Sequence, residues 1–323
     1  MLLHILMVIV GAALVLVGAD KLTDGSVALA RRFHIPEIVI GLTIVAFGTS
    51  LPEFIVSLFA SIQNAPAMSI GNIVGSNLFN TLMIVGMSAV VCPIAISRST
   101  VSKDIPLSLL ASIALPALAL DTLLDVNADA NVLSHGDGIV LLCFFAIFMA
   151  YTFSMAQSGK LDRVGEEIAE RDSQLSVLRV VLFIILGIAG LIAGGELFVD
   201  GACGIARQLG VSEAVIGLTL VAGGTSLPEL ATSVVAARKG KSDIAIGNVV
   251  GSNLFNIFWI LGVCSTVTPL SVQGIQWTDF AVLLGSMVLF WLFARTKHRV
   301  ERWEGAVLVT CYVAYLAALI VAL

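Results

Sequence analysis

Two glutamates interrupt long apolar stretches at matching places in the chain. Glu53 lies near the middle of the stretch 35–62, and Glu229 lies near the middle of 212–237. Neither stretch has a Lys or Arg near its centre that could pair with the carboxylate. In a lipid bilayer, an ionised side chain at that depth costs roughly 2.5–3.5 kcal/mol or more. Each carboxylate therefore needs a bound cation to balance its charge, unless it is protonated and bonded to the helix backbone.

The residues around both glutamates supply more oxygen atoms. In the segment GTSLPE, at 48–53 and again at 224–229, the proline removes a backbone donor and should open the helix. We expect the carbonyl groups near residues 46–49 to lose their helical partners, as they do where such a segment lines a cavity. Asn77 and Asn253, further along, should form hydrogen bonds between helices. Polar residues also recur every four positions on one face of the next stretch in each half: Asn72, Ser76 and Asn80, and Asn248, Ser252 and Asn256.

All of these groups are hard oxygen donors, which suit Ca²⁺, Na⁺ or Mg²⁺ and not Zn²⁺ or Cu⁺. The four histidines, at positions 4, 34, 135 and 298, fall near the ends of apolar stretches. One Ca²⁺ or two Na⁺ would balance the charge of two carboxylates. Ca²⁺ tolerates loose coordination whereas Mg²⁺ needs a rigid octahedron, so ligands gathered from several helices favour Ca²⁺.

The composition indicates that lipid surrounds these stretches. Of the 323 residues, 58% are hydrophobic and only 12% are charged, whereas a soluble domain has about twice that charged fraction. An ordinary soluble enzyme and a disordered chain are excluded, and a net charge of −5 without a basic patch argues against nucleic-acid binding. The chain can hold about ten spans, all helical because a lone segment in lipid must satisfy its own backbone hydrogen bonds. The expected spans are 2–19, 35–62, 67–92, 105–124, 136–156, 176–199, 212–237, 243–268, 277–295 and 303–323.

The positive charges give an orientation for these spans. With alternating spans, every Lys and Arg except Arg207 falls on one side of the membrane, which the positive-inside rule makes the cytoplasm. We therefore expect a multi-pass protein of the cell (inner) membrane with a retained first span and both termini outside. The segment 157–175 is then a cytoplasmic linker.

The chain repeats itself with an offset of 176 positions. GLTIVAFGTSLPE at 41–53 returns as GLTLVAGGTSLPE at 217–229, and IGNIVGSNLFN at 70–80 returns as IGNVVGSNLFN at 246–256. The same offset pairs Asp20 with Glu196 and Asp24 with Asp200. A duplicated scaffold without a transport role is the alternative, but such a scaffold has no reason to keep a glutamate inside each copy.

The repeat predicts the organisation of the chain. We expect a first repeat of five helices at 1–156, the linker at 157–175, and a second repeat of five helices at 176–323. Because five is odd, the second repeat enters the membrane upside down. The expected fold is an all-α polytopic membrane protein with two inverted-topology repeats, an arrangement typical of secondary transporters.

The paired motifs GTSLPE and GSNLFN resemble the signature repeats of the cation/calcium exchanger (CaCA) superfamily, and the short linker is similar to its prokaryotic Na⁺/Ca²⁺ exchangers. The resemblance implies that Glu53 and Glu229, with Thr49 and Thr225, bind Ca²⁺. One implied Na⁺ site uses Ala222, Thr225, Ser226, Glu229 and Ser252, and its mirror uses Ala46, Thr49, Ser50, Glu53 and Ser76. Asn80 and Asn256 would flank the central site, with Asn72 and Asn248 as weaker candidates. Many relatives have Asp where this chain has Asn256, which argues against K⁺ co-transport.

The function implied is secondary active exchange of Na⁺ for Ca²⁺ by alternating access, electrogenic and directed toward Ca²⁺ extrusion. A Ca²⁺/H⁺ antiporter of the same superfamily is the first alternative. An ion channel is a remote alternative. An intramembrane hydrolase that uses Ser50 or Ser226, or the carboxylate pair with water, is another, since it would need a base or metal near the nucleophile. The resemblance implies a transporter and not an enzyme, with no cofactor and no protein partner beyond the transported ions and the lipid bilayer.

Overall fold

The computed structural model describes residues 1–63, 65–124, 129–163, 176–210, 222–272 and 275–321. Within these ranges the chain is a helical multi-span membrane protein. Eight helices are long and apolar enough to cross a bilayer, and a ninth span consists of two pieces bent by 49°. The predicted all-α polytopic fold is confirmed. The expected span 212–237 is described only from residue 222 onward, so its first part lies outside the described residues.

The helices follow one another with only two-residue strands between some of them. Their bounds are α1 (Leu2–Phe33), α2 (Glu37–Ile40), η1 (Gly41–Val45), α3 (Ala46–Thr49), α4 (Leu51–Ile62), α5 (Pro66–Leu78), η2 (Phe79–Ile84), α6 (Val85–Val91), β1 (Ile94–Ala95), η3 (Thr100–Asp104), α7 (Ile105–Ala119), α8 (Asp121–Leu124), β2 (Val132–Leu133), α9 (His135–Arg163), α10 (Val177–Gln208), α12 (Ala222–Thr225), α13 (Leu227–Arg238), α14 (Ser242–Leu254), η5 (Phe255–Leu261), α15 (Gly262–Val267), β3 (Leu270–Ser271), α16 (Trp277–Lys297), β4 (Arg299–Val300) and α17 (Arg302–Val321). The η elements are π-helical segments.

Two helices extend well past the expected ends of their spans. The first expected span stops at residue 19, yet α1 continues to Phe33, and α10 continues past residue 199 to Gln208. The expectation was wrong because it ended the two spans just before an aspartate, Asp20 and Asp200. Charge limits how much of a helix lies in lipid, but Asp and Lys do not end a helical backbone.

The elements of the two halves correspond by the same offset as the sequence motifs. Shifting α4 by 176 positions gives the bounds of α13, and shifting α5 gives the bounds of α14. The π-helical segments η2 and η5 begin at Phe79 and Phe255, which are also 176 apart. These segments contain Asn80 and Asn256. The wider π turn therefore falls where the polar face of each helix reaches its last asparagine, as is frequent at functional sites.

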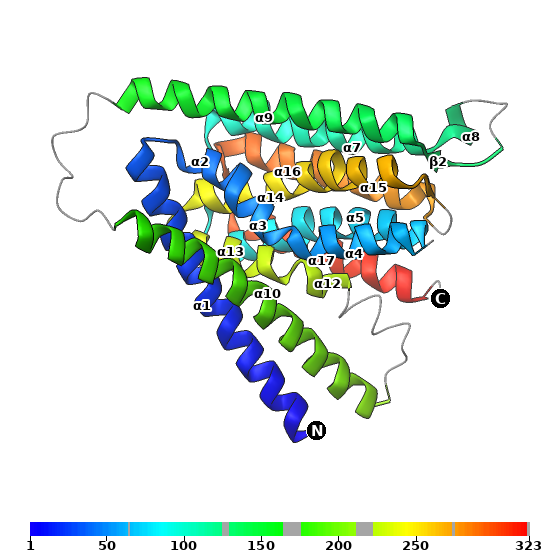
Figure 1. Ribbon diagram of the computed structural model, residues 1–323, viewed down its shortest axis with the longest axis horizontal. Helices are drawn as coiled ribbons and strands as arrows, with labels where there is room; N and C mark the ends of the chain where they lie inside the picture. Colours follow the sequence, from blue (N-terminus) through cyan, green and yellow to red (C-terminus); the bar gives the residue numbers. More distant parts are fainter. Residues whose placement is uncertain (64, 125–128, 164–175, 211–221, 273–274, 322–323) are drawn as a thin grey trace.

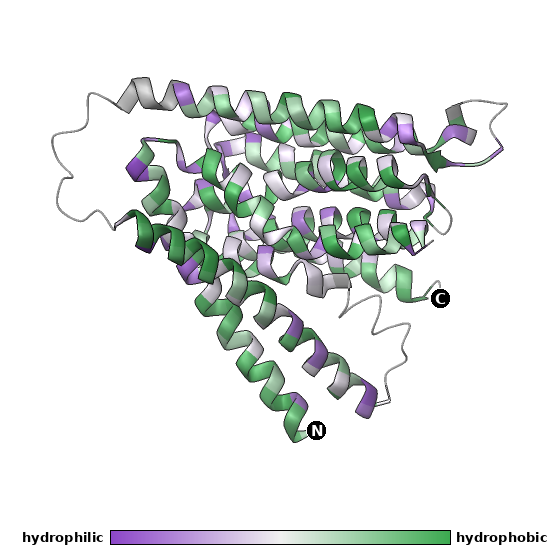
Figure 2. Ribbon diagram, in the orientation of Figure 1, coloured by the Kyte–Doolittle hydropathy of each residue, from purple (hydrophilic) through white to green (hydrophobic). Residues whose placement is uncertain are grey.

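The interior of the bundle is formed by two spans, Pro66–Val91 and Ser242–Val267, which come directly after α4 and α13 in the chain. In the most apolar window of the span Ser242–Val267, 94% of the residues are buried, and in Pro66–Val91 the share is 78%. The outer helices α1, α9, α10 and α17 bury only 17–22% of theirs. Hydrophobic residues cover most of α1 and α9 (Figure 2), as expected of helices that face lipid. The polar residues of α5 and α14 therefore lie at the centre of the molecule.

Helices α1 and α10 form a close pair that runs obliquely to the rest of the bundle (Figure 1). Glycines at intervals of seven let their backbones approach: a side chain at Gly18 would come within 2.8 Å of the Gly187 carbonyl oxygen, and one at Gly194 within 2.8 Å of the Val15 nitrogen. Small residues at such contacts are the usual means of packing helices tightly in membranes. The α1–α10 pair therefore forms one unit beside the inner helices.

The strands tie the loops of the two halves together. β1 pairs antiparallel with β4, with Ile94 opposite Val300, and β2 pairs antiparallel with β3, with Leu133 opposite Leu270. Strands of two residues contribute little stability by themselves. Their effect is to join the loops that follow α6 and α15 to connections in the other half.

Candidate cation site

The helix that contains each GTSLPE segment breaks at the serine, one residue after the threonine. α3 ends at Thr49 and α4 begins at Leu51, with Ser50 between them at φ −84° and ψ 7°. Ser226 occupies the same place before α13, at φ −89° and ψ 11°. The proline that follows at the second helical position cannot donate the next helical hydrogen bond. The expected opening of the helix at GTSLPE is thus present in both halves.

The opening is narrower than the sequence suggested. The Ala46 carbonyl keeps a helical partner, because the Ser50 amide donates to it at 3.0 Å, and the Thr49 hydroxyl lies 3.0 Å from the Val45 carbonyl. The expectation that carbonyl groups near 46–49 lack helical partners was wrong for Ala46, because the break begins one residue too late to free that carbonyl from the Ser50 amide. A carbonyl has a second lone pair, so this bond does not prevent Ala46 from contacting a cation.

The serine and glutamate of each break contact the other half and not each other. The pattern Ser-x-x-Glu usually forms a capping box within one helix. In both helices, however, the serine makes no side-chain cap. Instead the Ser226 hydroxyl donates to Glu53 Oε1 at 2.7 Å, and the Ser50 hydroxyl donates to Glu229 Oε1 at 3.0 Å. The two broken helices are therefore joined by a pair of crossed hydrogen bonds.

The crossed bonds bring the two carboxylates into one buried site. Glu53 and Glu229 are 0% and 1% exposed, and each occupies the first turn of its helix. Thr225 lies beside Glu53, and Thr49 lies beside Glu229. Helix N-termini carry a partial positive charge, which favours carboxylates at this position. The arrangement matches the discontinuous helices of secondary transporters, whose ends meet at an ion site.

Several buried oxygen atoms of the two carboxylates and of the helices α5, η2, α14 and η5 have no hydrogen-bond partner. Buried polar groups are normally paired, so each exception needs an explanation. In the described ranges eleven buried side-chain atoms lack a partner, and more than half of them belong to residues that the sequence singled out. These are Glu53 Oε2, Glu229 Oε2, Ser76 Oγ, Ser252 Oγ, Asn80 Oδ1 and Asn256 Oδ1. Oxygen atoms of this kind are the ligands that Ca²⁺ and Na⁺ take.

Asn72 and Asn248 brace the broken helices. The Asn72 amide donates to the Glu53 carbonyl at 3.4 Å and to Ser57 Oγ at 3.0 Å. Asn248 makes the same contacts with the Glu229 carbonyl at 3.3 Å and Ser233 Oγ at 3.0 Å. Ser57 and Ser233 were not among the residues expected at the site. Their signal was available, because both lie four residues after the glutamate and are repeated by the offset.

Asn77 and Asn253 join the inner helices of the two halves, as expected. The Asn256 amide donates to Asn77 Oδ1 at 2.9 Å, and the Asn80 amide donates to Asn253 Oδ1 at 3.1 Å. Asn77 itself donates to the Asn253 carbonyl at 3.3 Å. The prediction of hydrogen bonds between helices is confirmed for both residues.

The charge of the site comes from the two glutamates. In the described ranges, no His, Cys or Asp and no third Glu forms a group of three with these two glutamates. The remaining oxygen atoms are those of neutral hydroxyl and amide groups, so the site carries two negative charges when both carboxylates are ionised. Of the other expected ligands, Ala222 begins α12 at the edge of the described residues.

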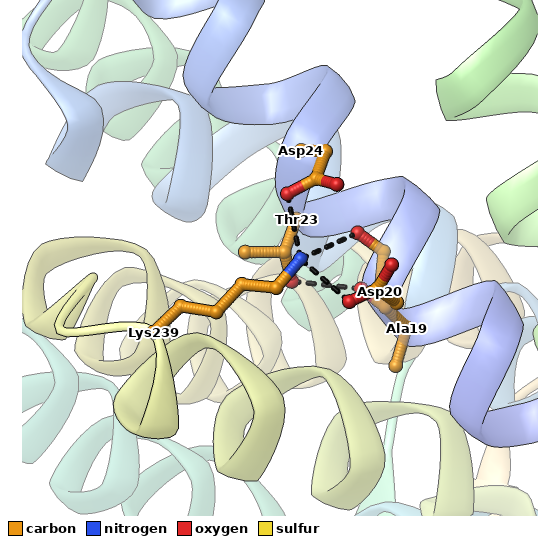
Figure 3. Close-up of polar contacts among 5 residues, drawn as sticks. All are labelled: Ala19, Asp20, Thr23, Asp24 and Lys239. Carbon is orange, nitrogen blue, oxygen red and sulfur yellow. Dashed lines mark hydrogen bonds and ion pairs between the residues drawn. The ribbon is translucent and has the colours of Figure 1, made fainter.

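A second group of charges lies where α13 ends. Lys239 Nζ is 2.6 Å from Asp20 Oδ1 and 2.6 Å from Asp24 Oδ1, so it ties α13 to α1 (Figure 3). Partial burial lowers the pKa of Lys239, but its hydrogen bonds to the two carboxylates outweigh burial and raise the pKa overall. Lys241 similarly contacts Glu37 Oε1 at 2.9 Å.

These ion pairs have no charged counterpart in the other half. The offset of 176 places Gln63 and Ala65 at the positions that correspond to Lys239 and Lys241. Neither of these side chains can form an ion pair. The ion pair of Asp20 with Lys239 therefore was not expected from the offset that pairs Asp20 with Glu196.

Two broken helices whose ends meet around paired buried carboxylates, inside a multi-span helical bundle, define a secondary transporter. The comparisons with known proteins agree. A family model described as "Sodium/calcium exchanger protein" matches residues 3–154 and 179–321. The sodium/calcium exchanger MaX1 of Methanosarcina acetivorans is 33% identical to the chain, with 98% of each protein covered. The chain belongs to the sodium/calcium exchanger family.

Other relatives extend over nearly the whole length as well. The inner membrane protein YrbG of Escherichia coli (strain K12) is 36% identical over 327 residues, which cover 99% of this chain and 97% of that protein. A solved structure of the sodium-calcium exchanger NCX_Mj, soaked with 10 mM Na⁺ and zero Ca²⁺, has a TM-score of 0.83 at 36% identity. It covers 98% of this chain and 99% of its own. The protein is thus a secondary transporter and not an enzyme, as the sequence implied.

Proposed function

We propose that the protein exchanges Na⁺ for Ca²⁺ across the membrane by alternating access around the site that Glu53 and Glu229 form. The observation that carries the proposal is the crossed pairing of Ser50 with Glu229 and of Ser226 with Glu53. It leaves the second oxygen atom of each carboxylate buried and unpaired. A buried charge is stable only when it is compensated, so the two oxygen atoms form a site for a cation.

The charge of this site explains how two ions can be coupled. One Ca²⁺ or two Na⁺ neutralise the two carboxylates, so either load makes the site neutral. A carrier with an empty site would have to move two uncompensated charges through the low-dielectric interior, at a cost of several kcal/mol. That penalty keeps the empty carrier from changing its access. Exchange with more than two Na⁺ for each Ca²⁺ would be electrogenic.

The ligand assignment follows the oxygen atoms of the site. Glu53 and Glu229, with the carbonyl groups of Thr49 and Thr225, bind Ca²⁺. The two Na⁺ positions use oxygen atoms of one half each: Ala46, Thr49, Ser50, Glu53 and Ser76 in the first, and Ala222, Thr225, Ser226, Glu229 and Ser252 in the second. Asn80 and Asn256 flank the central position. The support is that each of these residue pairs has unpaired oxygen atoms: Glu53 and Glu229, Ser76 and Ser252, and Asn80 and Asn256.

The two halves 1–156 and 176–323 are proposed to lie in the membrane in opposite orientations, joined by the cytoplasmic linker 157–175, with both termini outside. The moving part is the α1–α10 pair, which packs as one unit through its glycines. Its oblique path across the bundle would let it close the site from one side or the other (Figure 1). Ca²⁺ loaded from the cytoplasm would leave on the outer side, and entering Na⁺ would reset the carrier.

Uptake of ⁴⁵Ca²⁺ into proteoliposomes tests this function. Vesicles loaded with Na⁺ and diluted into Na⁺-free buffer should accumulate ⁴⁵Ca²⁺, whereas vesicles loaded with K⁺ should not. A second pair of vesicles carries a pH gradient and no Na⁺. Uptake driven by the pH gradient alone would contradict Na⁺/Ca²⁺ exchange and support a Ca²⁺/H⁺ antiporter. Single-channel currents in a planar bilayer would instead indicate a channel.

A further inference from the structure

We propose that Asn77 and Asn253 are positioning residues, each of which turns the amide oxygen of an asparagine from the other half toward the cation. Asn77 acts on Asn256, and Asn253 acts on Asn80. The inference rests on the proposed function, because it concerns how the site presents its neutral oxygen atoms. It goes beyond helix packing, since it makes the orientation of two amide groups a requirement for cation binding.

The hydrogen bonds of the four asparagines have a consistent direction. Asn256 and Asn80 each donate through Nδ2, to Asn77 Oδ1 at 2.9 Å and to Asn253 Oδ1 at 3.1 Å. The oxygen atoms of the same two amides, Asn256 Oδ1 and Asn80 Oδ1, have no partner. All four side chains are buried. The nitrogen ends are thus bound across the interface, and the oxygen ends are left for a ligand.

An amide needs this control because its two ends differ in charge. The Oδ1 atom accepts a hydrogen bond or contacts a cation, whereas the Nδ2 group carries hydrogens that repel one. A rotation of half a turn about the last side-chain bond exchanges the two ends without changing the shape of the group. A neighbour that accepts from Nδ2 therefore decides which end faces the site.

Asn77 and Asn253 donate to different partners, because one neighbouring residue differs between the two halves. Asn253 Nδ2 donates to Thr81 Oγ1 at 3.0 Å, and Thr81 in turn contacts Met287 Sδ at 3.3 Å. The position that corresponds to Thr81 is Ile257, which has no hydroxyl group. Asn77 Nδ2 donates to the Asn253 carbonyl instead, at 3.3 Å. Both positioning amides therefore have their nitrogen ends occupied, so their own oxygen atoms stay turned toward Asn256 and Asn80.

Substitution of the positioning residue and of its target distinguishes this role from packing. Asn77→Leu keeps a similar volume but cannot accept from Asn256, so the apparent affinity for Ca²⁺ should fall roughly fivefold. Asn256→Asp should remove this dependence, because a carboxylate presents an oxygen atom in either orientation. In the Asn256→Asp background, residue 256 cannot donate to Asn77 Oδ1 and the two oxygen atoms repel each other, so Asn77→Leu should not lower the affinity. The matched control is Asn80→Asp, in which the loss caused by Asn77→Leu should remain, because Asn253 and not Asn77 holds residue 80.

The measurement is the rise in thermal unfolding temperature of the purified protein as CaCl₂ or NaCl is titrated, together with the KM for ⁴⁵Ca²⁺ in proteoliposomes. The mirror pair gives a second test with the backgrounds reversed: Asn253→Leu should be rescued by Asn80→Asp and not by Asn256→Asp. Equal losses in both backgrounds, or no loss in either, would overturn the positioning role. A wild-type protein that neither ion stabilises would instead overturn the proposed function, and this inference with it.

Discussion

At the scale of single residues, the site depends on an exchange of partners between two copies of one motif. Ser50 and Ser226 could each cap their own helix, but each donates to the glutamate of the other copy. The exchange holds one oxygen atom of each carboxylate and leaves the other unpaired. Removal of the charge and removal of the serine therefore have different expected effects.

Glu53→Gln should abolish Na⁺-driven ⁴⁵Ca²⁺ uptake. The amide has one oxygen atom instead of two and no negative charge, so the site can no longer balance Ca²⁺ with the remaining carboxylate. Glu229→Gln should have the same effect. The control is Glu301→Gln, which alters a partly exposed glutamate beside Arg299 and should leave uptake unchanged. Full residual exchange in either site variant would defeat the assignment of the two glutamates.

Ser226→Ala should weaken Ca²⁺ binding without abolishing it. A hydrogen bond to a charged group contributes about 1.5–3 kcal/mol, which corresponds to a KM for Ca²⁺ about tenfold or more higher. Ser61→Ala is the matched control, because that buried hydroxyl donates to a backbone carbonyl in its own helix, that of Ser57, at 2.7 Å. Comparable KM changes in the two variants would mean that the crossed bond has no special importance.

At the scale of elements, the structure suggests which parts stay fixed and which part moves. The inner helices are joined across the halves by asparagine and serine side chains, so they should move little relative to one another. The α1–α10 pair has mostly lipid-facing residues and is tied to α13 by ion pairs on Lys239. The three predictions at this scale concern the Lys239 ion pairs, their pH dependence, and the glycine contact between α1 and α10.

Lys239→Gln should favour opening of the site at the end of α13, because it removes the ties from α13 to Asp20 and Asp24. Surface ion pairs are worth about 1 kcal/mol or less, so the population of that open state should rise at most about fivefold. In vesicles of known orientation, the KM for Ca²⁺ on the linker side should fall relative to the KM on the other side. Lys297→Gln, at the end of α16, serves as the control. An unchanged ratio of the two KM values in Lys239→Gln would contradict this role.

The pH dependence of the same ratio follows from the sign of the Lys239 shift. Its pKa is raised in the folded protein, so the ion pair is fully formed below the ordinary lysine pKa of about 10.4 and is lost as the pH rises through the folded pKa. Within the range used for transport, pH 6–9, the contribution of Lys239 should therefore be constant. A difference between wild type and Lys239→Gln that changes across this range would argue against an intact ion pair.

Gly18→Ala should separate α1 from α10 and destabilise the protein. The added methyl group would lie 2.8 Å from the Gly187 carbonyl oxygen and 2.8 Å from the Leu191 nitrogen, which are backbone atoms that cannot rotate away. Overpacking of this kind costs about 1–3 kcal/mol. Gly285→Ala is the control, because its added methyl group meets no described atom within 4 Å. Thermal unfolding in detergent should show a loss for Gly18→Ala alone, and equal unfolding temperatures would contradict the close contact.

At the scale of the whole molecule, the sequence predicted the fold because its signals were strong and repeated. Charges inside apolar stretches singled out Glu53 and Glu229, and the offset of 176 showed that each had a counterpart in the same surroundings. Hydropathy then located most of the spans. The ends of α1 and α10 were missed because hydropathy reports contact with lipid and not the extent of a helix.

The contacts between the halves could not be predicted in the same way. Ser-x-x-Glu has a local solution within one helix, and only the approach of the second copy makes the crossed solution available. The ties from Lys239 to Asp20 and Asp24 also join segments more than 200 positions apart, with no pattern that connects them. Duplication identified the residues of the site, whereas tertiary structure decided their partners.

Diffraction from crystals soaked with Sr²⁺, a heavier substitute for Ca²⁺, would locate the bound cation relative to Glu53 and Glu229. We expect one dominant anomalous peak between Glu53 and Glu229, at about the 2.3–2.6 Å oxygen distances of Ca²⁺ or slightly beyond. The peak should disappear in Glu229→Gln crystals. A dominant peak elsewhere in the protein, or one that persists without the Glu229 carboxylate, would contradict the claim that the two glutamates hold the cation together.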